Sequence, residues 1–283
     1  MSPAPIPRRF HQLDVFTATA LRGNPLAVVH DAQGLDDATM AAFARWTNLS
    51  ETTFLLPPED PGADYRVRIF TPGGELPFAG HPTLGSCAAW LSAGGQPRSA
   101  GLVVQECGVG LVPIRREGAR LAFAAPPLRR TGPLEADLLD RIVAGLGLAA
   151  GDILDHQWVD NGPGWCAVML GSVEQVRALR PDFGALRDLK LGVVAPCELD
   201  EDTTFEVRAF VPGLGINEDP VTGSLNASLA QWLVADGHMP AAYSARQGTM
   251  LGRAGQVFLS QDPQGQVWVG GDVVACVQGF VTL

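Results

Sequence analysis

The sequence lacks the cysteine and histidine patterns that mark disulfide-rich or zinc-binding proteins. Its five cysteines are scattered, odd in number and without a C-x-x-C pair, so neither a disulfide framework nor a zinc site is indicated. An H-x-x-x-H pattern is absent as well. We therefore expect no bound metal.

Long apolar runs and an excess of positive charge are also missing. No run approaches the roughly 18 apolar residues that span a membrane, and no apolar segment of the signal-peptide type follows the charged start, Met1 to Arg9. With 20 Lys and Arg against 30 Asp and Glu, the net charge is −10, which argues against nucleic acid as the main partner. We expect a cytoplasmic protein that binds neither membranes nor nucleic acid.

Motifs of nucleotide binding and of serine hydrolases are absent too. Gly73-Gly74 and Gly213 form neither a G-x-G-x-x-G motif nor a P-loop, and we expect no cofactor. Ser224, His81 and Asp219 would supply the residue types of a hydrolase triad. However, no G-x-S-x-G is present, and Ser224 would lie inside a helix and not on an exposed turn. A hydrolase is therefore disfavoured.

The most informative stretch that is present runs from Asn217 to Ser224. It follows a β-like run and precedes an apolar-periodic run, Leu225 to Leu233. Asp219 and Pro220 predict a helix start, with Asp219 as the cap and Pro220 in the first helical position. The free N–H groups of such a helix start favour an anion.

A second copy of this stretch occurs earlier in the chain. Gly80 to Ser86 matches Glu218 to Ser224 at a constant offset, since 219 − 81 and 224 − 86 are both 138. The preceding run, Arg68 to Pro72, likewise matches Arg208 to Pro212. This duplication predicts two similar lobes. Two lobes related by a pseudo-twofold axis would place both helix starts at one shared cleft.

The length and the order of the predicted elements indicate a two-domain α+β protein. A chain of 283 residues, 46% hydrophobic and 18% charged, suffices for two globular domains. Strands outnumber helices, so each lobe is expected to be a curled, mostly antiparallel, barrel-like sheet around a central helix. We place the lobes at residues 1–126 and 127–277, with 278–283 packing back on the first. Besides the two motif helices, helices are expected at 36–46, 134–146, 172–179 and 183–189.

Glu51 is the first candidate for catalysis. It lies between Ser50 and Thr52, ahead of the apolar Phe54-Leu55-Leu56. A carboxylate that apolar neighbours partly shield suits general acid–base work. The alternative is a solvated surface glutamate, and the local sequence alone favours that alternative, because most glutamates are solvated.

His81 and Asp219 occupy matching positions in the two copies. An imidazole and a carboxylate that meet across a cleft can bind a hydroxyl or an amine, or pass a proton. The alternatives are a plain helix cap for Asp219 and a capping or packed histidine for His81. Ser224, together with Thr222, could hold a carboxylate at the helix start.

The sequence resembles the PhzF family, the phenazine-biosynthesis isomerases and their relatives. The motifs that carry the resemblance span most of the chain, and G-H-P-T and E-D-P-V-T-G-S are the most specific of them. They are Phe16 to Ala18, Gly23 to Val29, Asn48 to Phe54, Arg68 to Pro72, Glu75 to Gly85 and Glu218 to Ser224. The resemblance implies a diaminopimelate epimerase-like fold of two lobes, with the active site between them. Two-cysteine racemisation is disfavoured, because Ala79 and Asn217 stand near the positions of the epimerase cysteines.

The resemblance also implies a chemistry and a set of roles. Glu51 would act as base and then as acid, without a cofactor, on a small carboxylate-bearing substrate such as dihydro-hydroxyanthranilate. His81, Asp219 and Ser224 would hold the polar groups of the substrate, and the amides of Gly80 and Gly223 would bind its carboxylate. A homodimer is the family expectation. Two alternatives stay open: an epimerase or racemase of an amino-acid-like substrate, and a non-catalytic small-molecule binding protein.

Overall fold

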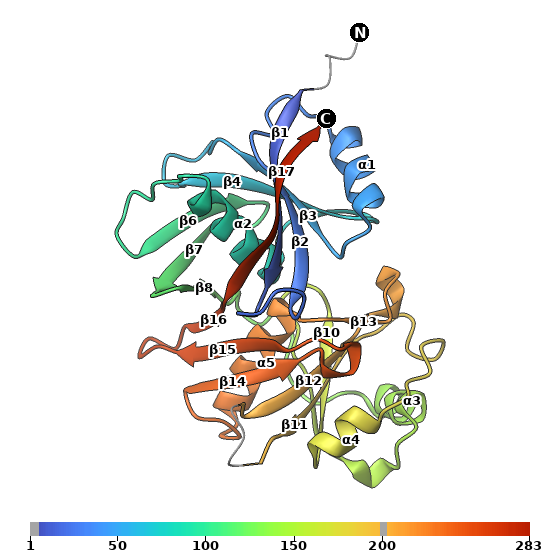
Figure 1. Cartoon of the computed structure of the whole chain (residues 1–283). Coiled ribbons are helices and arrows are strands. Elements are labelled where there is room, and N and C mark those ends of the chain that lie inside the picture. The colour runs from blue at the N-terminus through green and yellow to red at the C-terminus, as the bar shows by residue number, and fades with distance from the viewer. Residues whose placement is uncertain (1–5, 199–202) are drawn as a thin grey trace. The chain divides into compact units, whose positions relative to one another are not determined.

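The computed structural model describes residues 6–198 and 203–283. The chain forms two compact units, one comprising Met1–Ala124 with Gly270–Leu283 and the other Ala125–Val269 (Figure 1). The boundary predicted from the sequence lies two residues later, and the predicted returning segment, 278–283, is shorter than the observed one. Each unit has its own strands, helices and core, and each is described by itself.

The described part of the first unit is a sheet of nine strands with two helices. The strands are β1 (Pro7–Val15), β2 (Asn24–Val29), β3 (Thr52–Leu56), β4 (Tyr65–Thr71), β5 (Gly74–Leu76), β6 (Leu102–Cys107), β7 (Gly110–Glu117), β8 (Arg120–Ala124) and β17 (Val273–Thr282), and the helices are α1 (Asp37–Thr47) and α2 (Gly80–Ser92). Strand β17 pairs antiparallel with β1. From β1 the pairing continues through β2, β3, β4, β6, β7 and β8, with β5 alongside β4.

The second unit repeats this plan. Its strands are β9 (Ile153–Trp158), β10 (Trp165–Leu170), β11 (Lys190–Pro196), β12 (Phe205–Phe210), β13 (Glu218–Asp219), β14 (Ala242–Gln247), β15 (Gly255–Gln261) and β16 (Val267–Gly271), the last of which runs on into the first unit's part of the chain. Its helices are α3 (Ala136–Leu146), α4 (Val173–Ala178) and α5 (Gly223–Ala235), with short 3-10 turns η1 (Ala150–Asp152), η2 (Pro212–Leu214) and η3 (Thr249–Leu251).

The order of parallel and antiparallel pairs shows that the two units are duplicates. In the first unit β1–β2 is antiparallel, β2–β3 parallel, β3–β4 antiparallel, β4–β6 parallel and β6–β7 antiparallel. In the second unit the pairs β9–β10, β10–β11, β11–β12, β12–β14 and β14–β15 follow the same alternation. Helix α2 corresponds to α5, because each follows the short strand that pairs with the fourth strand. The duplicated α+β fold predicted from the sequence is confirmed.

Each unit is built around one buried helix. Helices α2 and α5 have 13 residues each and are apolar on nearly all sides, as expected of a helix that the surrounding structure encloses. In the first unit α2 contacts β1, β2, β3, β6, β8 and β17. In α5, Leu225 and Leu229 are almost fully buried, and each such side chain contributes about 1.5–3 kcal/mol. These helices fix where their first residues, the candidate site residues, are placed.

Two expectations about local structure were wrong. Thr222, not Asp219, is the N-cap of α5, because Asp219 is engaged with β12 as part of β13. Residues 183–188 form turns and not a helix. Their apolar side chains Phe183 and Leu186 nevertheless pack in the core of the second unit. Strand β14 was not predicted. Helix α1, which was expected at 36–46, is capped by Asp36, which accepts a hydrogen bond from the Thr39 N–H at 2.8 Å.

Within the described ranges, no helix is both long enough and apolar enough to cross a membrane.

Candidate active site

Glu51 stands immediately before strand β3, in the connection that follows α1. Asn48 ends α1 in the left-handed conformation, with φ of 54°. A hydrogen bond of 2.9 Å between the hydroxyls of Thr47 and Thr52 then ties the helix end to the strand start. Because Thr52 is fully buried, this short connection is held at both ends. The Glu51 side chain has 15% exposure, so most of it is shielded from bulk water.

His81 is the second residue of α2 and is buried, with 4% exposure. Burial lowers its pKa to about 3, although a hydrogen bond to the Pro25 backbone opposes the change. The imidazole is therefore neutral at physiological pH. Its Nδ1 lies 3.4 Å from the side-chain nitrogen of Asn24, the first residue of β2. These neighbours give the ring a fixed position.

Glu51 and His81 meet within the first unit. The Oε2 atom of Glu51 lies 3.5 Å from Nε2 of His81. The helix and the strand that carry them are joined one turn further along, where the hydroxyl of Ser86 donates to that of Thr53 at 2.9 Å. Gly80 precedes His81 as the first residue of α2. No side chain among the described residues caps that helix start, since the N-cap is Ala79.

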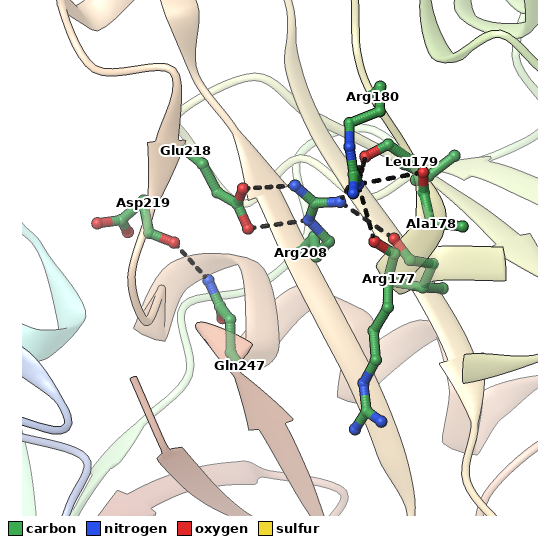
Figure 2. Close-up of polar contacts among 9 residues, drawn as sticks. Arg177, Ala178, Leu179, Arg180, Arg208, Glu218, Asp219 and Gln247 are labelled. Carbon is green, nitrogen blue, oxygen red and sulfur yellow. Dashed lines mark hydrogen bonds and ion pairs between the residues drawn. The ribbon is translucent and has the colours of Figure 1, made fainter. Parts of the chain in front are cut away.

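The second unit places the carboxylate of Asp219 ahead of α5. The Asp219 Oδ2 atom accepts a hydrogen bond of 2.6 Å from the hydroxyl of Thr222. Its backbone carbonyl accepts another of 3.0 Å from Gln247 (Figure 2). The preceding residue, Glu218, is held in a two-pronged ion pair by Arg208, with distances of 3.0 and 2.7 Å. Strand β13 is therefore fixed on both sides.

Ser224 is the second residue of α5, directly after Gly223. Its Oγ accepts a hydrogen bond of 3.0 Å from the indole N–H of Trp165. Its backbone carbonyl accepts one of 2.9 Å from the side chain of Asn161. An indole nitrogen can only donate, so the hydroxyl hydrogen of Ser224 is left for another acceptor, such as a substrate carboxylate.

The structure corrects the register of the duplication at its second motif. Helices α2 and α5 begin 143 residues apart, since 223 − 80 is 143, and not at the 138-residue spacing of the sequence match. His81 therefore corresponds to Ser224, the second residue of the other helix. Asp219 corresponds to Leu76, because β5 and β13 are matching strands. The expected equivalence of His81 and Asp219 was wrong, although both remain candidate site residues.

The two helix starts are supported in the same way but carry different chemistry. Asn24, which begins β2, contacts the second residue of α2, and Trp165, which begins β10, contacts the second residue of α5. In the parallel pairs, Ala27 lies opposite Thr52 and Val168 opposite Val193.

This register shows which residue replaces the Glu51 carboxylate in the second unit. Asn24 and Trp165 are 141 residues apart, as are Thr52 and Val193, so Glu51 corresponds to Gly192. A Cβ atom on Gly192 would approach Leu225 Cδ1 to 2.7 Å. A side chain at that position would therefore require Leu225 to move, and the second unit has no counterpart of the Glu51 carboxylate at this position.

The cysteines near the duplicated elements are poor acid–base groups. Cys87 in α2 and Cys166 in β10 are buried. Burial raises the pKa of each thiol to about 12. A thiol with such a pKa does not form the thiolate that two-cysteine racemisation needs.

Sequence reasoning missed the residues that orient the candidates. Asn24 was named only within the motif Gly23 to Val29, and Trp165 was not singled out. Gln247, which bonds to Asp219 and Thr222, lies in a strand that was not predicted. The one available signal was that the predicted turns before β2 and β10 match each other.

Comparisons with known proteins give a consistent result. A family model described as phenazine biosynthesis-like protein, PhzC-PhzF, matches residues 13–279. An uncharacterized isomerase of Mesorhizobium japonicum is 36% identical over 96% of this chain and 98% of its own length. The trans-2,3-dihydro-3-hydroxyanthranilate isomerase of Pseudomonas aeruginosa is 34% identical over 96% of this chain and 98% of its own. The crystal structure of a PhzF-family phenazine biosynthesis protein of Enterococcus faecalis has a TM-score of 0.82 at 25% identity, over 98% of this chain and 100% of that one.

Proposed function

The chain belongs to the PhzC-PhzF family of phenazine biosynthesis-like proteins and is an isomerase of the PhzF type, and we propose that Glu51 moves a proton between two carbon atoms of its substrate. The family resemblance drawn from the motifs is confirmed. The role of Glu51 and the identity of the substrate are our proposal.

The observation that carries this proposal is the contact between Glu51 and a neutral His81. The two side chains lie 3.5 Å apart, and burial lowers the His81 pKa to about 3. An ordinary histidine, with a pKa of about 6.5, would take a proton from a glutamic acid, whose ordinary pKa is about 4.3. His81 is a weaker base than an ordinary glutamate. A proton that Glu51 removes from the substrate therefore stays on Glu51, and one carboxyl group can return it.

The proposed reaction balances without a further reactant. A C–H bond of the substrate breaks and the proton forms an O–H bond with the Glu51 carboxylate, while the electron pair is delocalised over the substrate. The same O–H bond then breaks and a new C–H bond forms at a second carbon. One carboxyl group serves as base and then as acid, provided that water is kept from it.

The substrate we propose is a small cyclic carboxylate of the trans-2,3-dihydro-3-hydroxyanthranilate type. The support is the name of a relative that is 34% identical over 96% of this chain. Catalytic residues and fold transfer within a family more safely than the substrate does. We therefore test the chemistry with this compound first and treat it as a member of a class.

We further propose that Asp219, Ser224 and the amides of Gly80 and Gly223 bind the polar groups of the substrate. Asp219 offers a carboxylate acceptor, and the Ser224 hydroxyl has its hydrogen left for an acceptor because Trp165 occupies its oxygen. The helix starts at Gly80 and Gly223 present backbone N–H groups, which favour an anion.

The test is proton NMR of trans-2,3-dihydro-3-hydroxyanthranilate in D₂O with the wild type, Glu51→Gln and Glu59→Gln. Glu59→Gln is the control, because it removes an exposed carboxylate of the same unit. Wild type and control should convert the substrate, and Glu51→Gln should be slower by about 10²- to 10⁴-fold, the usual contribution of a general acid–base group. Equal turnover by all three proteins would refute the role of Glu51. Scrambling of a stereocentre without isomerisation would indicate an epimerase.

A further inference from the structure

Gln247, the last residue of β14, is fully buried beside the start of α5. Its side-chain amide makes four hydrogen bonds. Oε1 accepts from the backbone N–H of Thr222 at 3.0 Å and from Nδ2 of Asn226 at 2.8 Å. Nε2 donates to the backbone carbonyl of Asp219 at 3.0 Å and to the hydroxyl of Thr222 at 2.9 Å. These four bonds fill the ordinary capacity of an amide group.

The partners fix the direction of every bond in this group. The backbone N–H of Thr222 can only donate, so the Gln247 atom that faces it is the oxygen. The carbonyl of Asp219 can only accept, so the Gln247 atom that faces it is the nitrogen. The Thr222 oxygen therefore accepts from Gln247. Its single hydrogen goes to Oδ2 of Asp219, at the 2.6 Å distance typical of a hydroxyl that donates to a carboxylate.

The first unit has part of the same arrangement. Gln105 of β6 is fully buried and donates to the hydroxyl of Thr83 at 3.0 Å. Thr83 is the fourth residue of α2, and it donates to the carbonyl of Ala79, the N-cap, at 2.9 Å. The start of α2 is thus held by a chain of hydrogen bonds. It runs from a buried glutamine through the fourth helix residue to the carbonyl of the N-cap.

The second unit keeps this chain and adds a branch. Asn226, the fourth residue of α5, bonds to Gln247 and to the carbonyl of the N-cap Thr222 at 2.9 Å. The branch runs from Gln247 through the Thr222 hydroxyl to Asp219. Ala79 has no hydroxyl that could form such a branch in the first unit. The hydrogen bonds that both units share therefore stabilise the duplicated fold. The additional bonds in the second unit hold the Asp219 carboxylate.

We propose that Thr222 and Gln247 are positioning residues that orient the Asp219 carboxylate toward a hydrogen-bond donor of the substrate, such as a hydroxyl or an amine. The inference rests on the proposed function, in which Asp219 binds substrate. One carboxylate oxygen is held by Thr222, and the backbone of Asp219 is held by Gln247. On the other side of β13, Arg208 fixes Glu218 (Figure 2). The orientation of the Asp219 carboxylate is thus fixed before the substrate binds.

The experiment compares Thr222→Val, which removes the hydroxyl, with Thr222→Ser, which keeps it. Thr222→Val should raise KM about tenfold or more with kcat changed less than about twofold, because Asp219 loses the hydrogen bond that orients its carboxylate for binding. Thr222→Ser should stay within about twofold of the wild type in both constants. If both variants raise KM equally, or if Thr222→Val lowers only kcat, the inference is overturned.

Crystal structures of the same variants test positioning without a substrate. In Thr222→Val the carboxylate of Asp219 should leave its wild-type position, while the Gln247 amide and the start of α5 stay in place. An unmoved carboxylate overturns the inference whatever the substrate proves to be. The carboxylate could be displaced in the variant while the wild-type enzyme fails to convert dihydro-hydroxyanthranilate. That result would support the positioning role and overturn only the proposed substrate.

Gln247→Glu provides a second, independent variant. The introduced carboxyl group has one hydrogen when protonated and none when ionised, so it can donate to either Asp219 or Thr222 only while it is protonated. The ratio of its kcat/KM to that of the wild type should therefore fall as pH rises through the titration of the introduced group. A ratio that stays constant across the pH range in which NMR shows the introduced carboxyl group to titrate would contradict the donor role of Gln247.

Discussion

Nε2 of His81 lies 3.5 Å from Oε2 of Glu51, and burial lowers the pKa of that imidazole to about 3. The pair therefore differs from a His–carboxylate ion pair, in which a cationic imidazole would stabilise the carboxylate. Here the histidine is neutral at physiological pH and adds no positive charge beside Glu51. The predictions that follow test this neutrality and the elements that hold the two residues.

The first prediction is acid destabilisation of the first unit. His81 has a pKa of about 3 in the folded state against 6.5 for the free side chain, so between these values the unfolded chain binds more protons. Stability is therefore complete above about pH 6.5 and is lost as pH falls toward 3, with a slope of up to about 1.4 kcal/mol per pH unit. Urea unfolding measured from pH 7 to pH 4 gives this slope.

His30 is the matched control for that experiment. It is buried in the same unit, and burial, followed by the charges of neighbouring His11 and Arg9, lowers its pKa to about 4. His81→Gln and His30→Gln should each reduce the acid slope. Turnover should fall only in His81→Gln, because the described contacts of His30 do not include Glu51. Loss of turnover in both variants would show a general effect of folding.

The second prediction concerns Asn24, whose side-chain nitrogen lies 3.4 Å from Nδ1 of His81. Asn24→Asp replaces a neutral neighbour by a carboxylate, and an opposite charge favours the protonated imidazole. The pKa of His81 should rise, and His81 should begin to compete with Glu51 for the transferred proton. NMR titration of the His81 ring gives the pKa and a turnover assay gives kcat. An unchanged kcat despite a raised His81 pKa would contradict the proposed need for a weakly basic histidine.

The third prediction compares two corresponding ion pairs. Arg208 and Glu218 have side-chain exposures of 7% and 6%, whereas Arg68 and Glu75 have 24% and 42%. Arg208→Met leaves a buried carboxylate without its partner and should cost about 3–5 kcal/mol. Arg68→Met should cost about 0–1 kcal/mol, because water screens the exposed pair.

Denaturant unfolding of the two variants measures this difference. The double variant Arg208→Met with Glu218→Leu should recover part of the loss, since it removes both buried charges. Equal costs for Arg208→Met and Arg68→Met would show that burial of the pair does not decide its contribution.

The fourth prediction concerns Gly23, which precedes Asn24. A Cβ atom there would lie 2.2 Å from the carbonyl oxygen of Val15, and backbone cannot move aside as a side chain can. Gly23→Ala should cost about 1–3 kcal/mol and should lower turnover by displacing Asn24. Gly151→Ala is the control, because nothing lies within 4 Å of its added Cβ, and it should change stability by no more than about 0.5 kcal/mol. Thermal unfolding of both variants checks this.

The sequence predicted what local pattern determines. The helix expected at 36–46 is α1, which Asp36 caps. Glu51 and His81 could each be named from their surroundings, but their 3.5 Å contact depends on how α2 packs against β3. Their proposed roles remain predictions.

The errors came from places where distant residues override local preference. Asp219 and Pro220 form a good local helix start, yet Asp219 pairs with Ala209 in extended backbone. The N–H of the true cap, Thr222, is bonded by Gln247, which lies 25 residues further along the chain. Strand β14 was overlooked because its buried and exposed residues alternate only weakly. Phe183 and Leu186 are spaced as in a helix, but they pack in the core from a segment of turns. Apolar periodicity alone cannot distinguish such a segment from a short helix.

Strand β17 has a consequence for the order in which the protein is made. It completes the sheet of the first unit by pairing with β1, from Pro7 opposite Thr282 to Val15 opposite Val273. The whole of the second unit lies between these two strands in the sequence. During synthesis, the first unit is therefore completed last. One edge of β1 stays unpaired until β17 has been made. A chain that stops after Val269 would contain the complete second unit and a first unit that lacks an edge strand, which is the kind of exposed edge that promotes aggregation.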